Sequence, residues 1–488
     1  MGLRRGVSGM TRRPEGFTAE ALECSLSALL EMYPVGFRSG SRSVSESALD
    51  AGRLWIAYSG GLDSSVLLHA AVALSQVGRH AAAGASGPKV FGRELRAIHI
   101  DHGLHAQSAQ WACHCRMQCA RLGVPLIECP LVLHRQAGES LEAVARSARY
   151  AAFAKWLEPG DAVAAAQHRD DQAETLLLAL LRGSGVHGLA SMPARSRLGV
   201  GLLVRPLLAF GRADLETYAR QAGLSWVEDP SNCDVSLDRN LLRHQVLPRL
   251  RSRWPACDLS LARSATHSAE AASLLDGLAD ELLELVPGAR PGTLSIQKLS
   301  KLPEPRRRLV LRRWLVREGF QLPSSDRIRR IICELMPAAA DRAPLVAWRG
   351  CEIRRYRDDL YALLPLPPVP DQVIQLDRQL PLQLPAPLGR LCLPSGFEAE
   401  GLLSVCFRRP GLRCRTDQGA GADFHRGLKK LFQQAGVPGW IRPYVPLVLV
   451  DAELGAVAGL SVCDGRLAGV RWEGHPWERF GLFSGSES

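Results

Sequence analysis

The stretch that decides the fold is residues 59–64, which read SGGLDS and join two apolar segments. The segment before it, LWIAY at 54–58, has the length of a buried strand, and SVLLHAAVAL at 65–74 continues as a helix. A glycine-rich turn between a strand and a helix presents backbone N–H groups without helical acceptors, and the helix dipole adds partial positive charge. The sequence therefore predicts an anion cradle at residues 59–64.

The residue types in this turn indicate which anion it binds. Gly60 and Gly61 let the backbone approach an anion closely, whereas a carboxylate at Asp63 is a poor neighbour for bare phosphate unless it binds Mg²⁺. The turn lacks the Gly-Lys-Ser/Thr ending of a Walker loop, so we expect ATP chemistry other than γ-phosphate transfer. The ATP-binding residues predicted from the turn are Ser59, Gly60, Gly61, Leu62, Asp63 and Ser64.

Strand-like and helix-like segments alternate after the turn. The strands are expected at 96–100, 124–130 and 161–166, and the helices at 64–77, 107–121, 139–157 and 170–182. This alternation predicts an α/β fold with a Rossmann-like, doubly wound parallel sheet. Asp101 and His102 follow a strand at the edge of such a sheet where ligands bind, so we add both residues to the predicted ATP site.

Length and composition limit the remaining possibilities. A chain of 488 residues with a net charge of +11 predicts more than one domain and an anionic partner, with nucleic acid ahead of a membrane surface. No apolar run reaches 18 residues, and 13 cysteines without a signal peptide indicate a reducing cytoplasm. A metal site at Cys113, His114, Cys115 and Cys119 is the less favoured alternative to buried free cysteines. A dinucleotide site at GSGVHG, residues 183–188, is rejected because that segment follows a helix.

The chain divides by composition into five predicted parts. These are an N-terminal arm and lead-in at 1–52, a catalytic domain at 53–245, a helical domain at 246–365, a proline-rich linker at 366–387 and a C-terminal α+β domain at 388–488. The arginine-rich helical segments after residue 241 and the prolines near 366–387 set these boundaries.

Four further segments carry a family resemblance. They are HIDHGLHAQS (99–108), SLEAVARSARYAAF (140–153), AQHRDDQAETLLLALLRGSGVHGLASM (166–192) and EDPSNCDVSLDRNLLRHQVLP (228–248). Together with SGGLDS they resemble the tRNA(Ile)-lysidine synthetase family of PP-loop N-type ATP pyrophosphatases, and residues 428–450 resemble the last domain of that family. The resemblance implies a cytoplasmic, Mg²⁺-dependent ligase that binds ATP, free L-lysine and tRNA(Ile). A homodimer is left open.

The implied reaction joins lysine to C2 of the wobble cytidine, C34, in a CAU anticodon. It passes through an adenylated cytidine and yields lysidine, AMP and pyrophosphate. The residues agree with that chemistry, because His168, Asp171 and Glu174 recur every three residues near the start of a predicted helix and share one face. With Asp63, they form the predicted catalytic set. Asp171 and Glu174 are expected to position or deprotonate lysine or to share Mg²⁺, and His168 is expected near the phosphates. A solvated first helical turn is the alternative.

Basic residues supply the predicted contacts to phosphate or tRNA. Arg146 and Arg149 lie three residues apart on one predicted helix, and Arg239 and Arg243 lie four apart on another, so each pair can face one anion or form structural salt bridges. The predicted set is Arg146, Arg149, Arg205, Arg239, Asn240, Arg243, Lys429, Lys430 and Arg442. The run at Arg306, Arg307, Arg308, Arg312 and Arg313 is expected to be a solvated helix face.

Two positions depart from the family pattern. His105 stands where the family usually has arginine, and Gln167 replaces the first of two paired histidines. Two alternatives also stay open. One is another PP-loop tRNA-modifying enzyme, such as a thiolase, although no CxxC pair occurs in the sequence. The other is a tRNA-binding protein that has lost catalysis.

Overall fold

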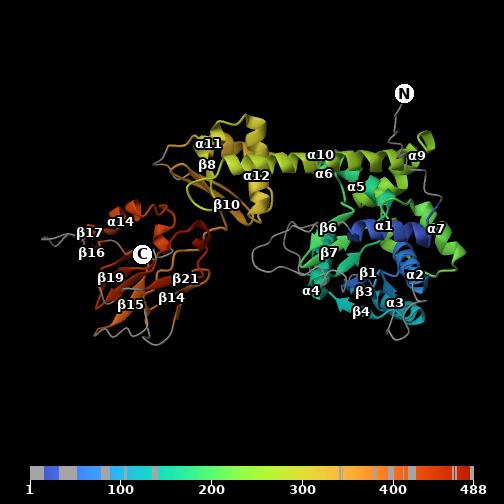
Figure 1. Cartoon of the computed structure of the whole chain (residues 1–488), viewed down its shortest axis with the longest axis horizontal. Coiled ribbons are helices and arrows are strands. Elements are labelled where there is room, and N and C mark those ends of the chain that lie inside the picture. The colour runs from blue at the N-terminus through green and yellow to red at the C-terminus, as the bar shows by residue number, and fades with distance from the viewer. Residues whose placement is uncertain are drawn as a thin grey trace, which may run out of the picture. The chain divides into compact units, whose positions relative to one another are not determined.

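The computed structural model describes most of the chain as two compact units, Met1–Ser273 and Leu274–Ser488 (Figure 1). The described residues are 16–31, 52–77, 88–103, 107–133, 141–339, 342, 344–376, 381–393, 401–409, 411–415, 425–463, 467 and 470–483. His105 and most of the predicted N-terminal arm lie outside them. Among the described helices, none is both long enough and apolar enough to cross a membrane.

A seven-stranded sheet forms the centre of the first unit. Its strands are β1 (Arg53–Ala57), β2 (Lys89–Val90), β3 (Arg93–Asp101), β4 (Leu126–Pro130), β5 (Ala162–Ala164), β6 (Arg195–Leu198) and β7 (Gly201–Val204). Five strands run parallel in the order β4-β3-β1-β5-β7. The predicted doubly wound sheet is confirmed. Two short strands, β2 and β6, add antiparallel pairs that the alternation of segments did not predict.

Helices cover both faces of this sheet. The helices that lie wholly within the first unit are α1 (Ala19–Glu31), α2 (Leu62–Val77), α3 (Ser108–Leu122), α4 (Leu141–Trp156), α5 (Arg169–Leu181), α6 (Val186–Leu189), α7 (Arg212–Gln221), α8 (Asp238–Leu241) and α9 (Leu247–Arg253). The four helices predicted from sequence begin and end within two residues of α2, α3, α4 and α5. Residues of β1 alternate between the faces: Leu54 and Ile56 pack with α1, α2, α3 and α7, whereas Trp55 packs with α4.

The strand order places the glycine-rich turn at a topological switch point. From β1 the chain moves to β3 on one side and later returns to β5 on the other side. Ligands bind outside the carboxyl ends of parallel strands at such a point, because the two connections diverge and leave a crevice. The turn at 59–64 leaves β1, and residues 165–168 leave β5, so this order brings the starts of α2 and α5 together.

The second unit begins inside a long helix and contains more strand than the sequence predicted. Its first part holds α10 (Cys257–Leu285), α11 (Ile296–Ser300), α12 (Glu304–Arg317), α13 (Ser325–Arg330), β8 (Leu294–Ser295), β9 (Leu345–Trp348), β10 (Cys351–Tyr356) and β11 (Asp359–Leu363). The strands form an antiparallel sheet in the order β8-β11-β10-β9. The predicted helical domain omitted this sheet, because its strands are short and two of the six residues in β10 are arginines.

The C-terminal part of the second unit is mostly β structure. It contains α14 (Leu428–Gln434) and the strands β12 (Ile374–Gln375), β13 (Leu382–Gln383), β14 (Arg390–Cys392), β15 (Leu403–Cys406), β16 (Arg413–Arg415), β17 (His425–Gly427), β18 (Leu447–Val450), β19 (Glu453–Val457), β20 (Ser461–Val462) and β21 (Arg471–Glu473). The proline-rich stretch at 366–387 contributes β12 and β13, each at the end of its sheet. Proline suits edge strands because it lacks the N–H that a central strand must donate.

Candidate active site

Internal hydrogen bonds fix the shape of the turn at residues 59–64. The Ser64 hydroxyl donates to the Gly61 carbonyl at 3.0 Å and accepts from the Ser59 N–H at 3.2 Å. The Ser65 N–H donates to the Gly61 carbonyl at 3.0 Å, which leaves the preceding N–H groups of α2 without acceptors further back in the helix. The serine hydroxyls therefore shape the turn, and its N–H groups at the start of a helix are donors of the kind that bind anions.

Gly60 is required where it stands. Its φ of +81° disfavours any other residue, and a β-carbon there would lie 2.9 Å from Cys115 Sγ and 3.1 Å from Val227 Cγ2. The Val227 N–H also donates to the Gly60 carbonyl at 2.9 Å. The turn is thus packed closely from behind, and Cys115 belongs to the core. No metal-binding group of three or more His, Cys, Asp or Glu residues occurs in the described part of the chain.

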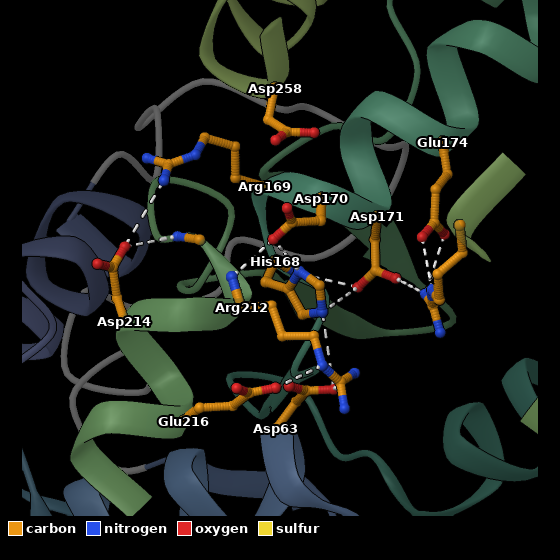
Figure 2. A network of polar contacts seen from close by, with 12 residues as sticks. Asp63, His168, Arg169, Asp170, Asp171, Glu174, Arg212, Asp214, Glu216 and Asp258 are labelled. Atoms are coloured by element: carbon orange, nitrogen blue, oxygen red, sulfur yellow. Dashed lines mark hydrogen bonds and ion pairs between the residues drawn. The ribbon is translucent and has the colours of Figure 1, made fainter. Parts of the chain in front are cut away.

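Asp63 lies in the first turn of α2 and faces the start of α5 (Figure 2). One carboxylate oxygen, Oδ1, is buried without a hydrogen-bond partner, and Oδ2 lies 3.7 Å from both His168 Nε2 and Arg212 Nη1. Burial raises the pKa of Asp63, although the two nearby cations oppose this effect. A carboxylate oxygen without a protein donor fits a Mg²⁺ ligand, because Mg²⁺ takes one or two carboxylates together with water and substrate phosphates.

His168 is the residue at which these groups meet. It caps α5, is only 1% exposed, and lies among three carboxylates (Figure 2). Its Nε2 is 3.4 Å from Asp171 Oδ2, and its Nδ1 is 3.4 Å from Asp170 Oδ2. Burial alone lowers a histidine pKa, but the carboxylates outweigh burial and raise the pKa of His168. The site therefore favours a positively charged imidazole.

Two carboxylates and two arginines form a buried cluster beside His168. Arg239 donates to Asp171 at 2.9 Å and to Glu174 at 2.7 Å. Arg243 donates to Asp171 at 3.0 Å and to Glu174 at 2.6 and 3.0 Å. Burial opposes charge on Asp171 and on both arginines, yet nearby opposite charges prevail: His168 and the two arginines lower the pKa of Asp171, and the two carboxylates raise the pKa of each arginine. Glu174 is only 1% exposed, so the pairing with arginine keeps its charge tolerable in the interior.

Asn240 and Arg205 make contacts within the protein. Asn240 is buried and donates to the carbonyls of Ser231 and Asp234, both at 2.9 Å, which holds the segment before α8. Arg205 is 5% exposed and donates to Gln167 Oε1 at 3.1 Å, to the Pro193 carbonyl at 2.7 Å and to Tyr150 at 3.4 Å. The amide oxygen of Gln167 thus helps to hold the buried guanidinium of Arg205 in place.

Asp101 and His102 lie at the carboxyl end of β3. Asp101 accepts from the Gly103 N–H at 2.8 Å, and Arg149 contacts His102 Nε2 at 3.1–3.3 Å. Burial and the Arg149 charge lower the pKa of His102 to about 4, so its imidazole is neutral at pH 7. Arg146 is exposed and lies over the Tyr150 ring at 5.4 Å. This second group of predicted residues lies at a strand end on the same edge of the sheet as the turn.

The predicted basic residues of the second unit are mainly at its surface. Lys429 and Lys430 are exposed on α14, and Arg442 donates to the Val437 carbonyl at 3.0 Å. Three arginines of the run at 306–313 are engaged within the protein: Arg307 with the Leu302 and Ser300 carbonyls, Arg308 with Glu304, and Arg313 with Asp276 and Asp280. Part of that run therefore stabilises the fold.

Three residues at the site were not predicted from the sequence: Asp170, Arg212 and Arg251. Asp170 accepts from the Arg212 N–H at 2.6 Å and from Arg251 Nη2 at 2.7 Å. His168 first, and then these two partners, hold the pKa of Asp170 low despite burial. The doubled aspartate in HRDDQAET was the only local signal for Asp170. Nothing local singles out Arg251, because it is one of three arginines in RLRSR at 249–253.

Comparison with known proteins finds matches along most of the chain. A PP-loop domain matches residues 39–250, the TilS substrate binding domain matches 294–361, and the TilS substrate C-terminal domain matches 403–474. A tRNA(Ile)-lysidine synthase from Methylococcus capsulatus is 42% identical over 85% of this chain and 93% of its own length. Proteins of the same name are 45% identical in Alkalilimnicola ehrlichii (83% and 89% covered) and 42% identical in Coxiella burnetii (86% and 91% covered).

Proposed function

This chain belongs to the tRNA(Ile)-lysidine synthase family, and we propose that it joins L-lysine to C2 of C34 in the CAU anticodon of tRNA(Ile). ATP is consumed, and AMP and pyrophosphate are released. The observation that carries the proposal is the meeting of an anion-binding turn with Asp63, His168, Asp171 and Glu174 at one switch point of the sheet. Such a site suits adenylation followed by attack of an amine.

The first step activates the cytosine. The C2 carbonyl oxygen attacks the α-phosphorus of ATP, the bond to pyrophosphate breaks, and an adenylated cytidine forms. We propose that the N–H groups of residues 60–64 bind the phosphates and that a positively charged His168 lies beside the developing negative charge. Asp63 would hold Mg²⁺, which neutralises phosphate charge when it is bound.

The second step requires neutral lysine. An amine with a pKa near 10.4 is unprotonated in only about one molecule in a thousand at neutral pH, so the site must orient the amine and accept its proton. We assign positioning of the lysine to Asp171 and Glu174. His168, Arg239 and Arg243 hold the Asp171 carboxylate in its charged form, which makes it a weak base and a good partner for an ammonium group. When the amine attacks C2, the bond between C2 and the oxygen of AMP breaks, and the proton that the amine loses passes to the departing AMP phosphate or to water.

The basic surface residues complete the proposal. Lys429, Lys430 and Arg442 in the second unit, and Arg146 and Arg149 in the first, are proposed to contact the tRNA backbone, since exposed cations provide most of the affinity for nucleic acid. We propose the cytoplasm as the place of reaction, because tRNA, ATP and free lysine occur there together.

The test uses two transcripts that share the CAU anticodon. The purified protein is incubated with Mg·ATP, labelled lysine and either a tRNA(Ile) body or an elongator tRNA(Met) body. We expect lysine label on the isoleucine transcript alone, together with AMP. AMP without lysine transfer would indicate another nucleophile, such as the sulfur of a thiolation reaction. Binding of tRNA without turnover would indicate a protein that has lost catalysis. Light scattering on the same preparation distinguishes a monomer from a homodimer.

A further inference from the structure

The Asp170 carboxylate joins three structural elements at the back of the site. Its Oδ2 lies 3.4 Å from His168 Nδ1 and accepts from the Arg212 N–H, at the start of α7, at 2.6 Å (Figure 2). Its Oδ1 accepts from Arg251 Nη2, on α9, at 2.7 Å. The Asp170 side chain is 14% exposed, so these partners occupy most of its surroundings. A change at Arg251 therefore reaches His168 through one intervening side chain.

Arg251 extends this connection to another helix. Its guanidinium donates through Nε to Asp258 Oδ2 at 2.7 Å and through Nη2 to Asp258 Oδ1 at 3.0 Å. Such a two-point contact fixes direction as well as distance. Asp258 is the second residue of α10, which continues for 29 residues from the first unit into the second. The first turn of α10 is thereby tied to Asp170.

His168 is held in a way that makes it sensitive to its neighbours. It is 1% exposed, and neither ring nitrogen makes a hydrogen bond to any described group. Instead the ring lies 3.4–3.7 Å from carboxylates of Asp63, Asp170 and Asp171. A shift of a few tenths of an ångström in the Asp170 carboxylate is enough to form a hydrogen bond at His168 Nδ1 or to move the carboxylate out of reach of it. The ring orientation therefore depends on where Asp170 is held.

From these contacts we infer that Asp170, Arg251 and Asp258 form a positioning chain, through which the first turn of α10 sets the orientation of His168. None of the three has to touch a substrate. The inference rests on the proposed function, because it takes His168 to act in adenylation. It gives Arg251, which lies just outside the segments that carry the family resemblance, a specific effect on the rate of the chemical step.

The test is a double-mutant cycle between Asp170 and Asp258, the two end residues of the positioning chain. Asp170→Asn, Asp258→Asn and the double variant are compared by AMP formation, with kcat and the KM for tRNA measured separately. Each single change is expected to lower kcat about tenfold or more and to leave KM within about threefold, because misplacing a reacting group slows the chemistry. The kcat of the double variant is expected to be no lower than that of the slower single variant, because both substitutions interrupt the same positioning chain.

The control is Asp280→Asn, the same substitution further along α10. Asp280 accepts from Arg313 at 2.6 and 2.7 Å, so this variant loses a comparable ion pair without touching the positioning chain, and its kcat should be unchanged. A folded Asp258→Asn protein with wild-type kcat would overturn the inference. A double variant whose fold decrease in kcat equals the product of the two single decreases would also overturn it.

A second variant covers the case in which Asp258→Asn does not fold. Arg251→Lys keeps the charge but cannot donate to two carboxylates through a planar fork. Its kcat should fall at an unchanged melting temperature, and wild-type kcat would again overturn the inference. An inactive wild-type protein would instead contradict the proposed function, so the two failures are distinguishable.

Discussion

Two buried histidines, one in each unit, have pKa values shifted in opposite directions. His168 lies among three carboxylates, and their charge raises its pKa despite burial. His475 is 4% exposed, its ring lies 4.0 Å from that of Trp472, and burial lowers its pKa to about 4. Burial opposes charge on both rings. Three carboxylates at 3.4–3.7 Å outweigh it at His168, whereas the single Glu478 carboxylate, 4.0 Å from His475 Nε2, does not. One histidine is therefore positively charged among carboxylates, as the proposed role in adenylation requires, and the other is a neutral core residue.

Basic residues differ between the same two regions. Arg239 and Arg243 are largely buried, and each donates to both Asp171 and Glu174. Lys429 and Lys430 are exposed on α14. Changes to the buried arginines should therefore affect folding and chemistry, whereas changes to the exposed lysines should affect only association with an anionic partner.

The largest effect is expected for His168→Gln. Loss of a cation at the phosphates should lower the rate of AMP formation by about 10²–10³-fold, the usual cost of removing one preorganised electrostatic contact. The matched control, His475→Gln, should leave that rate within about twofold. Steady-state AMP release at saturating ATP and tRNA measures both. Equal effects of the two substitutions would contradict the distinction between the two histidines.

Arg243→Ala should be the most destabilising of the basic-residue changes. It removes three hydrogen bonds to Glu174 and Asp171 and leaves buried carboxylate charge with fewer partners, at a cost of about 3–5 kcal/mol in the free energy of unfolding. Urea unfolding of the variant beside Lys429→Ala gives the comparison, and the lysine variant should unfold within about 0.5 kcal/mol of wild type. A stable Arg243→Ala protein would show that solvent reaches Glu174 readily.

The stability of the C-terminal region should depend on pH through His475. Its pKa is about 4 when folded and near the ordinary 6.5 when unfolded, so the unfolded chain binds more protons between these values. Stability should therefore fall as the pH drops from about 6.5 to 4, by up to about 3 kcal/mol, and should not change through this group above pH 7. His475→Phe should flatten the profile in that window. Parallel profiles for the two proteins would contradict the assignment.

The smallest effect is expected for the double variant Lys429→Ala, Lys430→Ala. Each lysine that contacts a phosphate contributes roughly one unit to the slope of log affinity against log salt, so the slope should fall by about one to two units. Affinity for tRNA between 50 and 200 mM salt, measured by filter binding, gives the slope, and the melting temperature should be unchanged. An identical slope would exclude these lysines from the tRNA interface.

Local sequence predicted those parts of the molecule that depend on local order. The turn at 59–64, the alternation of strands and helices, and the shared face of His168, Asp171 and Glu174 all follow from residue spacing. The Asp170–Arg251 contact does not, because it joins residues 81 positions apart. Spacing alone also could not distinguish Arg205, buried against Gln167, from exposed arginines of the same unit. The roles of Arg205 and of the exposed arginines in phosphate or tRNA binding stay predictions.

The most direct measurement uses ATP labelled at the α-phosphate, incubated with the protein and tRNA(Ile) in the absence of lysine. If one site first adenylates C34 and then admits an amine, label will appear on the tRNA and will be released as AMP when lysine is added. His168→Gln should form little labelled tRNA. If wild-type protein transfers lysine to the tRNA but label never appears on the tRNA under any condition, the two-step account is contradicted.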